Sequence, residues 1–96
     1  MLSHLFSPEA IREFDDAFDW YENQATGLGD RFAASVHQSL ELICRFPLAS
    51  ACVYSDARRR LVKRFPYVVI YRADAEIIQV ISVFHTSRDP MICSPG

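Results

Sequence analysis

The sequence predicts an α+β fold in the order β-α-α-β-β-β, with a two-helix antiparallel hairpin packed on a small antiparallel sheet. Between residues 8 and 46, apolar residues recur every three or four positions in two successive stretches, which is the period of amphipathic helices. From residue 60 onward, three short runs are rich in the Val, Ile, Phe and Tyr that favour strands. Two helices with one apolar face each need a third surface, and the sheet supplies it.

The N-terminal residues predict a short strand and then a helix. A strand is expected over residues 2–6, because a turn signal follows at once. Ser7-Pro8-Glu9 marks a helix start, since Ser caps a free backbone N–H, Pro tolerates the first turn and Glu suits the positive helix end. The helix should end near Gly27, where glycine adopts a left-handed cap. Its expected apolar stripe is Ile11, Phe14, Phe18, Tyr21 and Ala25.

A second helix follows directly and completes the hairpin. Pro47 stops it, and the residue before a proline is itself biased away from helix. Two amphipathic helices joined by a few residues favour an antiparallel pair. The expected apolar stripe of the second helix is Leu28, Phe32, Val36, Leu40 and Ile43.

The C-terminal half predicts the sheet. Residues 48–56 have the composition of turn and loop, and residues 73–76 that of a hairpin connection. Pro66 lacks a backbone donor and therefore falls at a bend or an edge. Short links between strands predict an antiparallel meander. The predicted strands cover residues 60–65, 67–72 and 77–84.

Length and charge limit the possible functions. The chain has 96 residues, which is one domain spanning 1–96. Its net charge of −2 argues against a protein that coats nucleic acid, because that task requires a basic surface. The charge is unevenly divided: residues 1–48 contain eight acidic and three basic residues, and residues 49–96 contain four acidic and seven basic ones. Such a division is expected either of two different binding faces or of one solvated acidic hairpin.

Cysteines and termini indicate the compartment. The three cysteines, Cys44, Cys52 and Cys93, form neither a disulfide framework nor a paired metal motif. Cys44 is expected in the core. The N-terminus lacks a signal-peptide pattern, and no apolar run approaches the length of a membrane span. We therefore expect a cytoplasmic protein with no metal, no small-molecule cofactor and no membrane partner.

Three segments resemble the RelE/ParE superfamily, the toxins of bacterial type II toxin–antitoxin systems. They are SPEAIREFDDAFDWYENQATGLGDRF in the hairpin, RFPYVVIYR on the middle strands and VISVFHTSRDP at the last strand. The resemblance covers residues 3–90 and implies the same fold as the residue patterns do. It also implies a cognate antitoxin that wraps the toxin in a hetero-oligomer, and a role in plasmid stabilization.

The superfamily contains two mechanisms, and this sequence resembles one more than the other. RelE-like members cut messenger RNA on the ribosome with Lys and Arg on the sheet and a late Tyr or His. ParE-like members inhibit DNA gyrase. Here Val68 stands where a RelE-like arginine is expected, and no aromatic residue follows Arg88. A valine cannot stabilise the charged phosphorane of RNA cleavage. The low net charge also favours a protein target.

The leading hypothesis is a ParE-like gyrase inhibitor neutralised by an antitoxin. The alternatives are a ribosome-dependent mRNA endonuclease and a non-toxic antitoxin-binding module, so whether the chain is an enzyme stays open. Catalysis by an endoribonuclease would use His85 and Arg88, although a hydrogen-bonding role at the strand end is the simpler interpretation of His85. Trp20 is expected to lie off the core stripe as an exposed partner anchor. The other predicted partner-binding residues are Arg58, Arg59, Arg60, Lys63 and Arg64.

Overall fold

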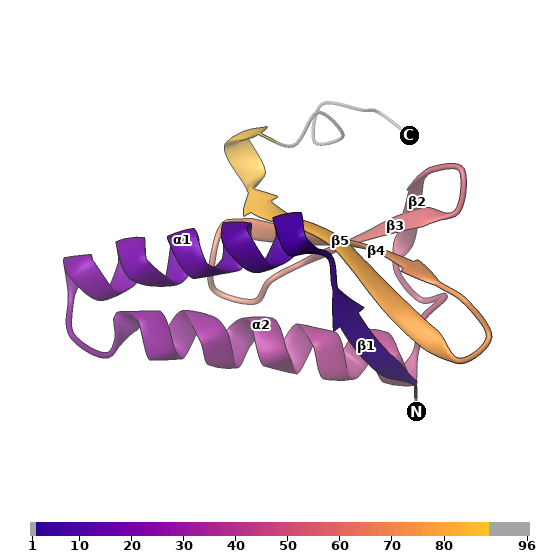
Figure 1. Cartoon of the computed structure of the whole chain (residues 1–96), viewed down its shortest axis with the longest axis horizontal. Coiled ribbons are helices and arrows are strands. Elements are labelled where there is room, and N and C mark those ends of the chain that lie inside the picture. The colour runs from indigo at the N-terminus through magenta and orange to yellow at the C-terminus, as the bar shows by residue number, and fades with distance from the viewer. Residues whose placement is uncertain (1, 89–96) are drawn as a thin grey trace.

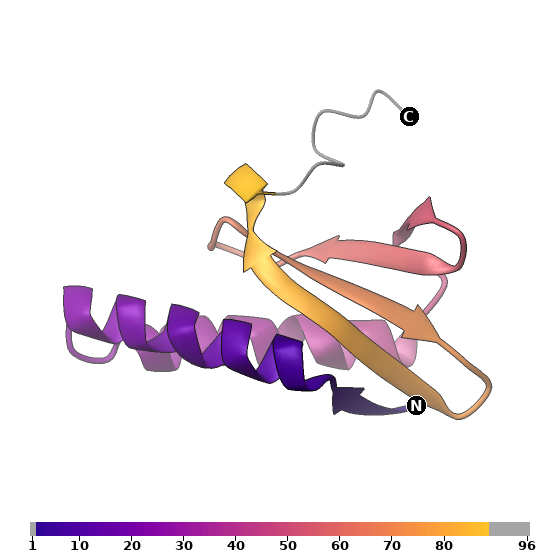
Figure 2. The same cartoon turned by 45° about the horizontal axis from the view of Figure 1, so that its top comes forward.

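The computed structural model describes residues 2–88 and has two layers, a helical hairpin and a five-stranded sheet (Figures 1 and 2). The sheet has the order β1-β5-β4-β3-β2. The hairpin consists of α1 (Pro8–Gln24) and α2 (Leu28–Arg45). The strands are β1 (Ser3–Phe6), β2 (Ala51–Tyr54), β3 (Ala57–Leu61), β4 (Tyr67–Ala73) and β5 (Ile77–His85). The predicted α+β class is confirmed, with one strand more than expected.

The extra strand is β2, in a segment predicted to be loop. Its four residues pair antiparallel with β3, with Ala51 opposite Arg59 and Cys52 opposite Arg58, and a register shift follows before Tyr54. Because β2 is a short edge strand, the sequence signal was too weak to find it. The predicted strand over residues 60–65 is also shifted. It begins at Ala57, because the three arginines belong to the strand, and it ends at Leu61.

β1 runs parallel to β5, so the sheet is mixed rather than wholly antiparallel. Ser3 lies opposite Ile77 and Phe6 opposite Val80. The other neighbouring strands are joined by short turns, which force antiparallel pairing. β1 is separated from β5 by most of the chain, and no turn constrains its direction. The expectation of a purely antiparallel sheet was therefore wrong at this edge.

The core lies between the hairpin and one face of the sheet. The α2 stripe is confirmed, since Phe32, Val36, Leu40 and Ile43 are all buried. The α1 stripe is confirmed in part, since Tyr21 is buried and Phe14 packs against the core. Ile11, however, is 48% exposed, and Ala10 and Ala17 are buried instead. Alanine lets the helix backbone approach its neighbours closely, which decides which face of α1 turns inward.

The cysteines occupy different environments. Cys44 is buried, as predicted, and burial raises the pKa of its thiol. Cys52 is exposed on β2, and Cys93 lies outside the described residues. No helix within residues 2–88 is both long and apolar enough to cross a membrane.

The turn between the helices is held by one carboxylate. Gly27 has a left-handed φ of +88°, as predicted, but it is the N-cap residue of α2. The predicted role of Gly27 as the cap that ends α1 was wrong, because α1 ends earlier, at Gln24, and its C-cap residue Ala25 is extended. The two carboxylate oxygens of Glu22 on α1 accept the backbone N–H groups of Gly27 and Gly29 at 2.9 Å each. The N-cap residue of α2 is a glycine and has no side chain to accept a hydrogen bond, so the Glu22 side chain of α1 caps the free N–H groups at the start of α2 instead.

β5 extends beyond the end of β1, and side chains at the start of α1 form hydrogen bonds with the backbone groups on the edge of β5 that β1 leaves uncovered. The Ser7 hydroxyl, predicted to cap α1, accepts from the Ala10 N–H at 3.0 Å and also donates to the Ile81 carbonyl at 2.9 Å. Six residues further along, Glu13 Oε1 accepts the backbone N–H of Val83 at 3.0 Å and the hydroxyl of Ser82 at 2.7 Å. Two side chains thus replace the missing strand and fix α1 over β5.

Glu13→Ala should reduce the free energy of unfolding by about 2 kcal/mol, because it leaves the Val83 N–H and Ser82 without their charged acceptor. Glu13→Gln is the matched control, since its amide oxygen can still accept both bonds, and it should lose less than about 1 kcal/mol. Urea unfolding measures both values. Equal losses in the two variants would contradict the assigned role of these hydrogen bonds.

Candidate functional site

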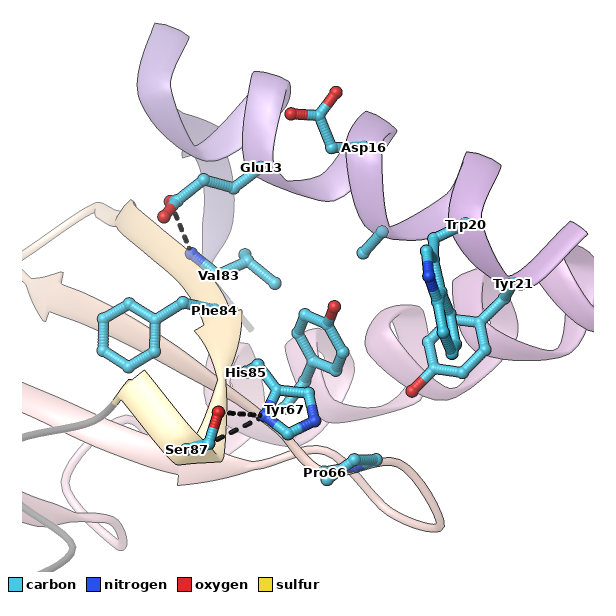
Figure 3. Close-up of a pocket in the computed structure, with 11 residues that line it drawn as sticks. Glu13, Asp16, Trp20, Tyr21, Pro66, Tyr67, Val83, Phe84, His85 and Ser87 are labelled. Carbon is cyan, nitrogen blue, oxygen red and sulfur yellow. Dashed lines mark hydrogen bonds between the residues drawn. The ribbon is translucent and has the colours of Figure 1, made fainter. Parts of the chain in front are cut away.

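A groove of about 620 Å³ lies between α1 and the C-terminal end of β5 (Figure 3). One wall comes from successive turns of α1 and the other from the end of β5 and the start of β4. Figure 3 shows Trp20 and Tyr21 on one side of the space and Tyr67 and His85 on the other, whereas the ring of Phe84 points away from it. The lining residues are Glu13, Asp16, Ala17, Trp20, Tyr21, Pro66, Tyr67, Val83, Phe84, His85 and Ser87.

His85 is fixed at the floor of the groove by its neighbours. It lies opposite Tyr67 in the β4–β5 ladder, and the two ring centroids are 5.4 Å apart. Its Nδ1 accepts the Ser87 N–H at 3.1 Å and lies 2.8 Å from the Ser87 hydroxyl. An Nδ1 that accepts a backbone N–H leaves the proton of the neutral ring on Nε2. The Thr86 N–H also donates to the Pro66 carbonyl, which anchors this turn to the base of β4.

Trp20 and Tyr21 form the aromatic wall on α1. Trp20 is 57% exposed, in agreement with the expectation that it lies off the core stripe. It packs edge-on against Tyr21 at 5.1 Å, and Tyr21 in turn lies 6.0 Å from Tyr67. Burial, and secondly the charge of an ionised Tyr67, raise the pKa of Tyr21 above its ordinary value of 10.0. Tyr21 therefore remains a neutral hydroxyl across the physiological range.

The charged side chains of the groove are acidic. Glu13 lines it with the carboxylate that also binds β5, and Asp16 is exposed one turn further along α1. Among the side chains that the structure describes, none of those lining the groove is a lysine or an arginine. The site therefore combines two carboxylates, several aromatic faces and one imidazole.

The three adjacent arginines lie away from this groove and do not share one face. In the β3–β4 register Arg58 lies opposite Tyr71 and Arg59 opposite Ile70, so strand alternation turns Arg59 to the other side of the sheet. Arg58 Nη1 donates to the Ser50 carbonyl at 2.6 Å, which braces the segment after α2. Arg60 reaches the Ser50 hydroxyl at 3.5 Å.

The remaining predicted residues lie at the β3–β4 turn and after β5. Lys63 and Arg64 are exposed, and Arg64 has a left-handed φ of +71°. Arg64 lines a second groove of about 700 Å³ together with Arg31 and the apolar Leu28. Arg88 ends the short 3₁₀ helix Thr86–Arg88, and its side chain lies outside the described part of the chain.

The sequence alone did not predict that the groove around His85 is also lined by Glu13, Asp16, Tyr21 and Tyr67. Part of the signal was present, because residues 13, 16, 17, 20 and 21 follow helical spacing and therefore share one face of α1. The contact between that face and the end of β5 depends on tertiary structure. Within residues 2–88 no three His, Cys, Asp or Glu side chains gather in a way that could hold a metal ion.

The arrangement of a helical hairpin on a mixed sheet also occurs in solved structures. The structure is similar to the chromosomal ParDE toxin–antitoxin system from P. aeruginosa, with a TM-score of 0.72 and 16% identity over 88% of this chain and 96% of that one. It is also similar to YafQ from E. coli strain BL21(DE3), with a TM-score of 0.59 and 10% identity over 91% and 96%.

Sequence comparison identifies the particular family. The family model for the ParE toxin of the parDE type II toxin–antitoxin system matches residues 5–90. The chain therefore belongs to the ParE toxin family, and membership implies an antitoxin partner. No curated protein sequence matches the chain.

Tyr21→Phe should make stability less dependent on alkaline pH. The pKa of Tyr21 is higher in the folded state than in the unfolded chain, so its neutral form contributes stability that is complete below about pH 10 and lost as pH rises through the folded-state pKa. Above about pH 10 the unaltered protein should lose more free energy of unfolding than the variant does. Denaturant unfolding at several pH values tests this, and parallel curves would contradict it.

Proposed function

We propose that this chain is a ParE-like toxin that acts in the cytoplasm by binding and inhibiting DNA gyrase, and that its cognate antitoxin neutralises it in a hetero-oligomer. The observation that carries the proposal is the acidic character of the groove beside His85. Glu13 and Asp16 line that groove, and no lysine or arginine does so among the described side chains. A protein surface is a better target for such a site than an RNA phosphate.

Ribonuclease chemistry requires a different arrangement. Cleavage of RNA needs an activated 2′-hydroxyl and positive groups around the phosphorane. Carboxylates beside His85 repel a phosphate instead of stabilising it. Val68, at the position of a RelE-like arginine, is completely buried and unable to contact RNA. Both features support inhibition by binding.

The alternative is a RelE-like, ribosome-dependent mRNA endonuclease, and one observation favours it. Nδ1 of His85 is occupied, whereas Nε2 has no hydrogen bond within residues 2–88, so this nitrogen is available for proton transfer. A chain that neither inhibits gyrase nor cuts RNA, yet binds its antitoxin, would be a non-toxic binding module. Either toxic function is consistent with a role in plasmid stabilization.

Two purified assays distinguish these functions. The protein should inhibit DNA supercoiling by gyrase and leave ribosome-bound messages intact in a reconstituted translation system. His85→Ala should retain the inhibition, because the proposal assigns the histidine no proton-transfer step. Message cleavage that disappears in His85→Ala, with the fold unchanged by circular dichroism, would overturn the proposal in favour of the endonuclease.

The second groove is the proposed contact for an acidic segment of the antitoxin. Arg31 and Arg64 flank the apolar Leu28 there, so an acidic and apolar peptide fits its chemistry. Lys63 is exposed in the same turn. This assignment keeps the predicted partner role of Lys63 and Arg64.

Arg64→Glu should weaken binding of the antitoxin encoded with this chain by about fivefold at low salt, since it reverses a charge at the contact. Arg12→Glu is the control, because Arg12 is exposed on α1 and does not line this groove. Isothermal titration calorimetry at two salt concentrations gives both dissociation constants. An equal effect of the two variants would remove the second groove from the antitoxin contact.

A further inference from the structure

We infer that the groove between α1 and β5 binds an arginine side chain presented by a partner protein. This inference goes beyond the proposed function and does not depend on which target the toxin inhibits. Three properties favour this occupant: aromatic faces in the groove, carboxylates without counter-ions among the described side chains, and an acidic surface around the groove on α1.

The aromatic walls suit a flat cation. Trp20 is 57% exposed, so much of its indole is open to contact, and Figure 3 shows it beside the cavity with Tyr21 and Tyr67. Indole and phenol rings attract cations through the negative potential of their faces. The guanidinium of arginine is planar and weakly hydrated, and it stacks on such rings better than the compact ammonium of lysine does. An aromatic groove of this kind therefore favours arginine.

Two carboxylates supply the complementary charge. Asp16 is exposed and forms no ion pair or hydrogen bond within residues 2–88. Glu13 uses Oε1 to bind β5, and its Oε2 has no hydrogen bond in the described part of the chain. Oε2 of Glu13 and both oxygens of Asp16 are thus available to N–H donors. The other titratable groups in the groove are Tyr21, Tyr67 and His85.

The surface around the groove extends the same charge. Glu9, Asp15 and Asp19 are all exposed on α1, and Arg12 is the only basic residue of that helix. A basic partner segment would be attracted along α1 and then anchored by one arginine in the groove. The second groove, with Arg31 and Arg64, has the opposite charge. The molecule therefore offers two chemically distinct docking sites.

Trp20 is the only tryptophan of the chain, so its fluorescence reports on the groove. The probe is a blocked Gly-Arg-Gly peptide, and the control is the same peptide with citrulline, which keeps the shape of arginine but has no charge. The arginine peptide should change the emission saturably, with a dissociation constant on the order of 1 mM for a single side chain. The citrulline peptide should bind at least about threefold more weakly.

Asp16→Asn and Asp15→Asn form a matched pair. Both remove one exposed charge from the same turn of α1, but only Asp16 lines the groove. Asp16→Asn should weaken binding of the arginine peptide about threefold or more, and Asp15→Asn should change it less than about twofold. Neither variant should change the fold, because both side chains are exposed and neither forms a hydrogen bond or ion pair with the described side chains.

Three results would overturn the inference. Equal binding of the arginine and citrulline peptides would show that the groove does not recognise the cation. Equal effects of the two Asp variants would show that the peptide is attracted by the overall negative charge of α1 and not by a specific contact with Asp16. Tighter peptide binding by Arg88→Gln would identify the occupant as this chain's own arginine instead of a partner's. If the protein does not inhibit gyrase in the assays above, this test of the groove is unaffected.

Discussion

The structure depends on how the backbone N–H and C=O groups on the uncovered edge of β5 obtain their hydrogen bonds. β1 pairs with β5 only as far as Val80, and beyond that point the strand would present unpaired backbone groups. Ser7 and Glu13 supply the missing partners from the first turns of α1. Because these bonds determine where α1 crosses the sheet, they also determine the distance between its outer face and His85. The groove is therefore a consequence of satisfying backbone hydrogen bonds.

The sequence predicted the elements whose signals are local. Ser7 defined the start of α1 through capping chemistry, and the periodicity of α2 identified its buried face correctly. Features that depend on distant parts of the chain were missed. β2 becomes a strand only by pairing with β3, and the parallel direction of β1 is set by its contact with β5. On α1, periodicity alone could not decide between two adjacent faces, and close packing of alanines selected one.

The same limit applied to the candidate site. Trp20 could be identified as exposed because its position on the helix is a local property. Its neighbours across the groove come from β4 and β5, more than forty residues away in the sequence. Three adjacent arginines suggested one basic patch, yet strand alternation separates Arg59 from Arg58 and Arg60. Composition thus indicated the charges of the two halves correctly, but tertiary structure determined which charges meet.

The pairing of β1 with β5 has a consequence for synthesis. The first strand to leave the ribosome must wait for the last one, since residues 3–6 pair with residues 77–80. Until β5 emerges, β4 also lacks its longer neighbour, and the hairpin has only part of a sheet to cover. Such long-range pairing delays completion of the sheet until residues 77–80 have been translated. Before that point, one edge of the domain and part of the surface under the hairpin stay open to solvent or to a binding partner.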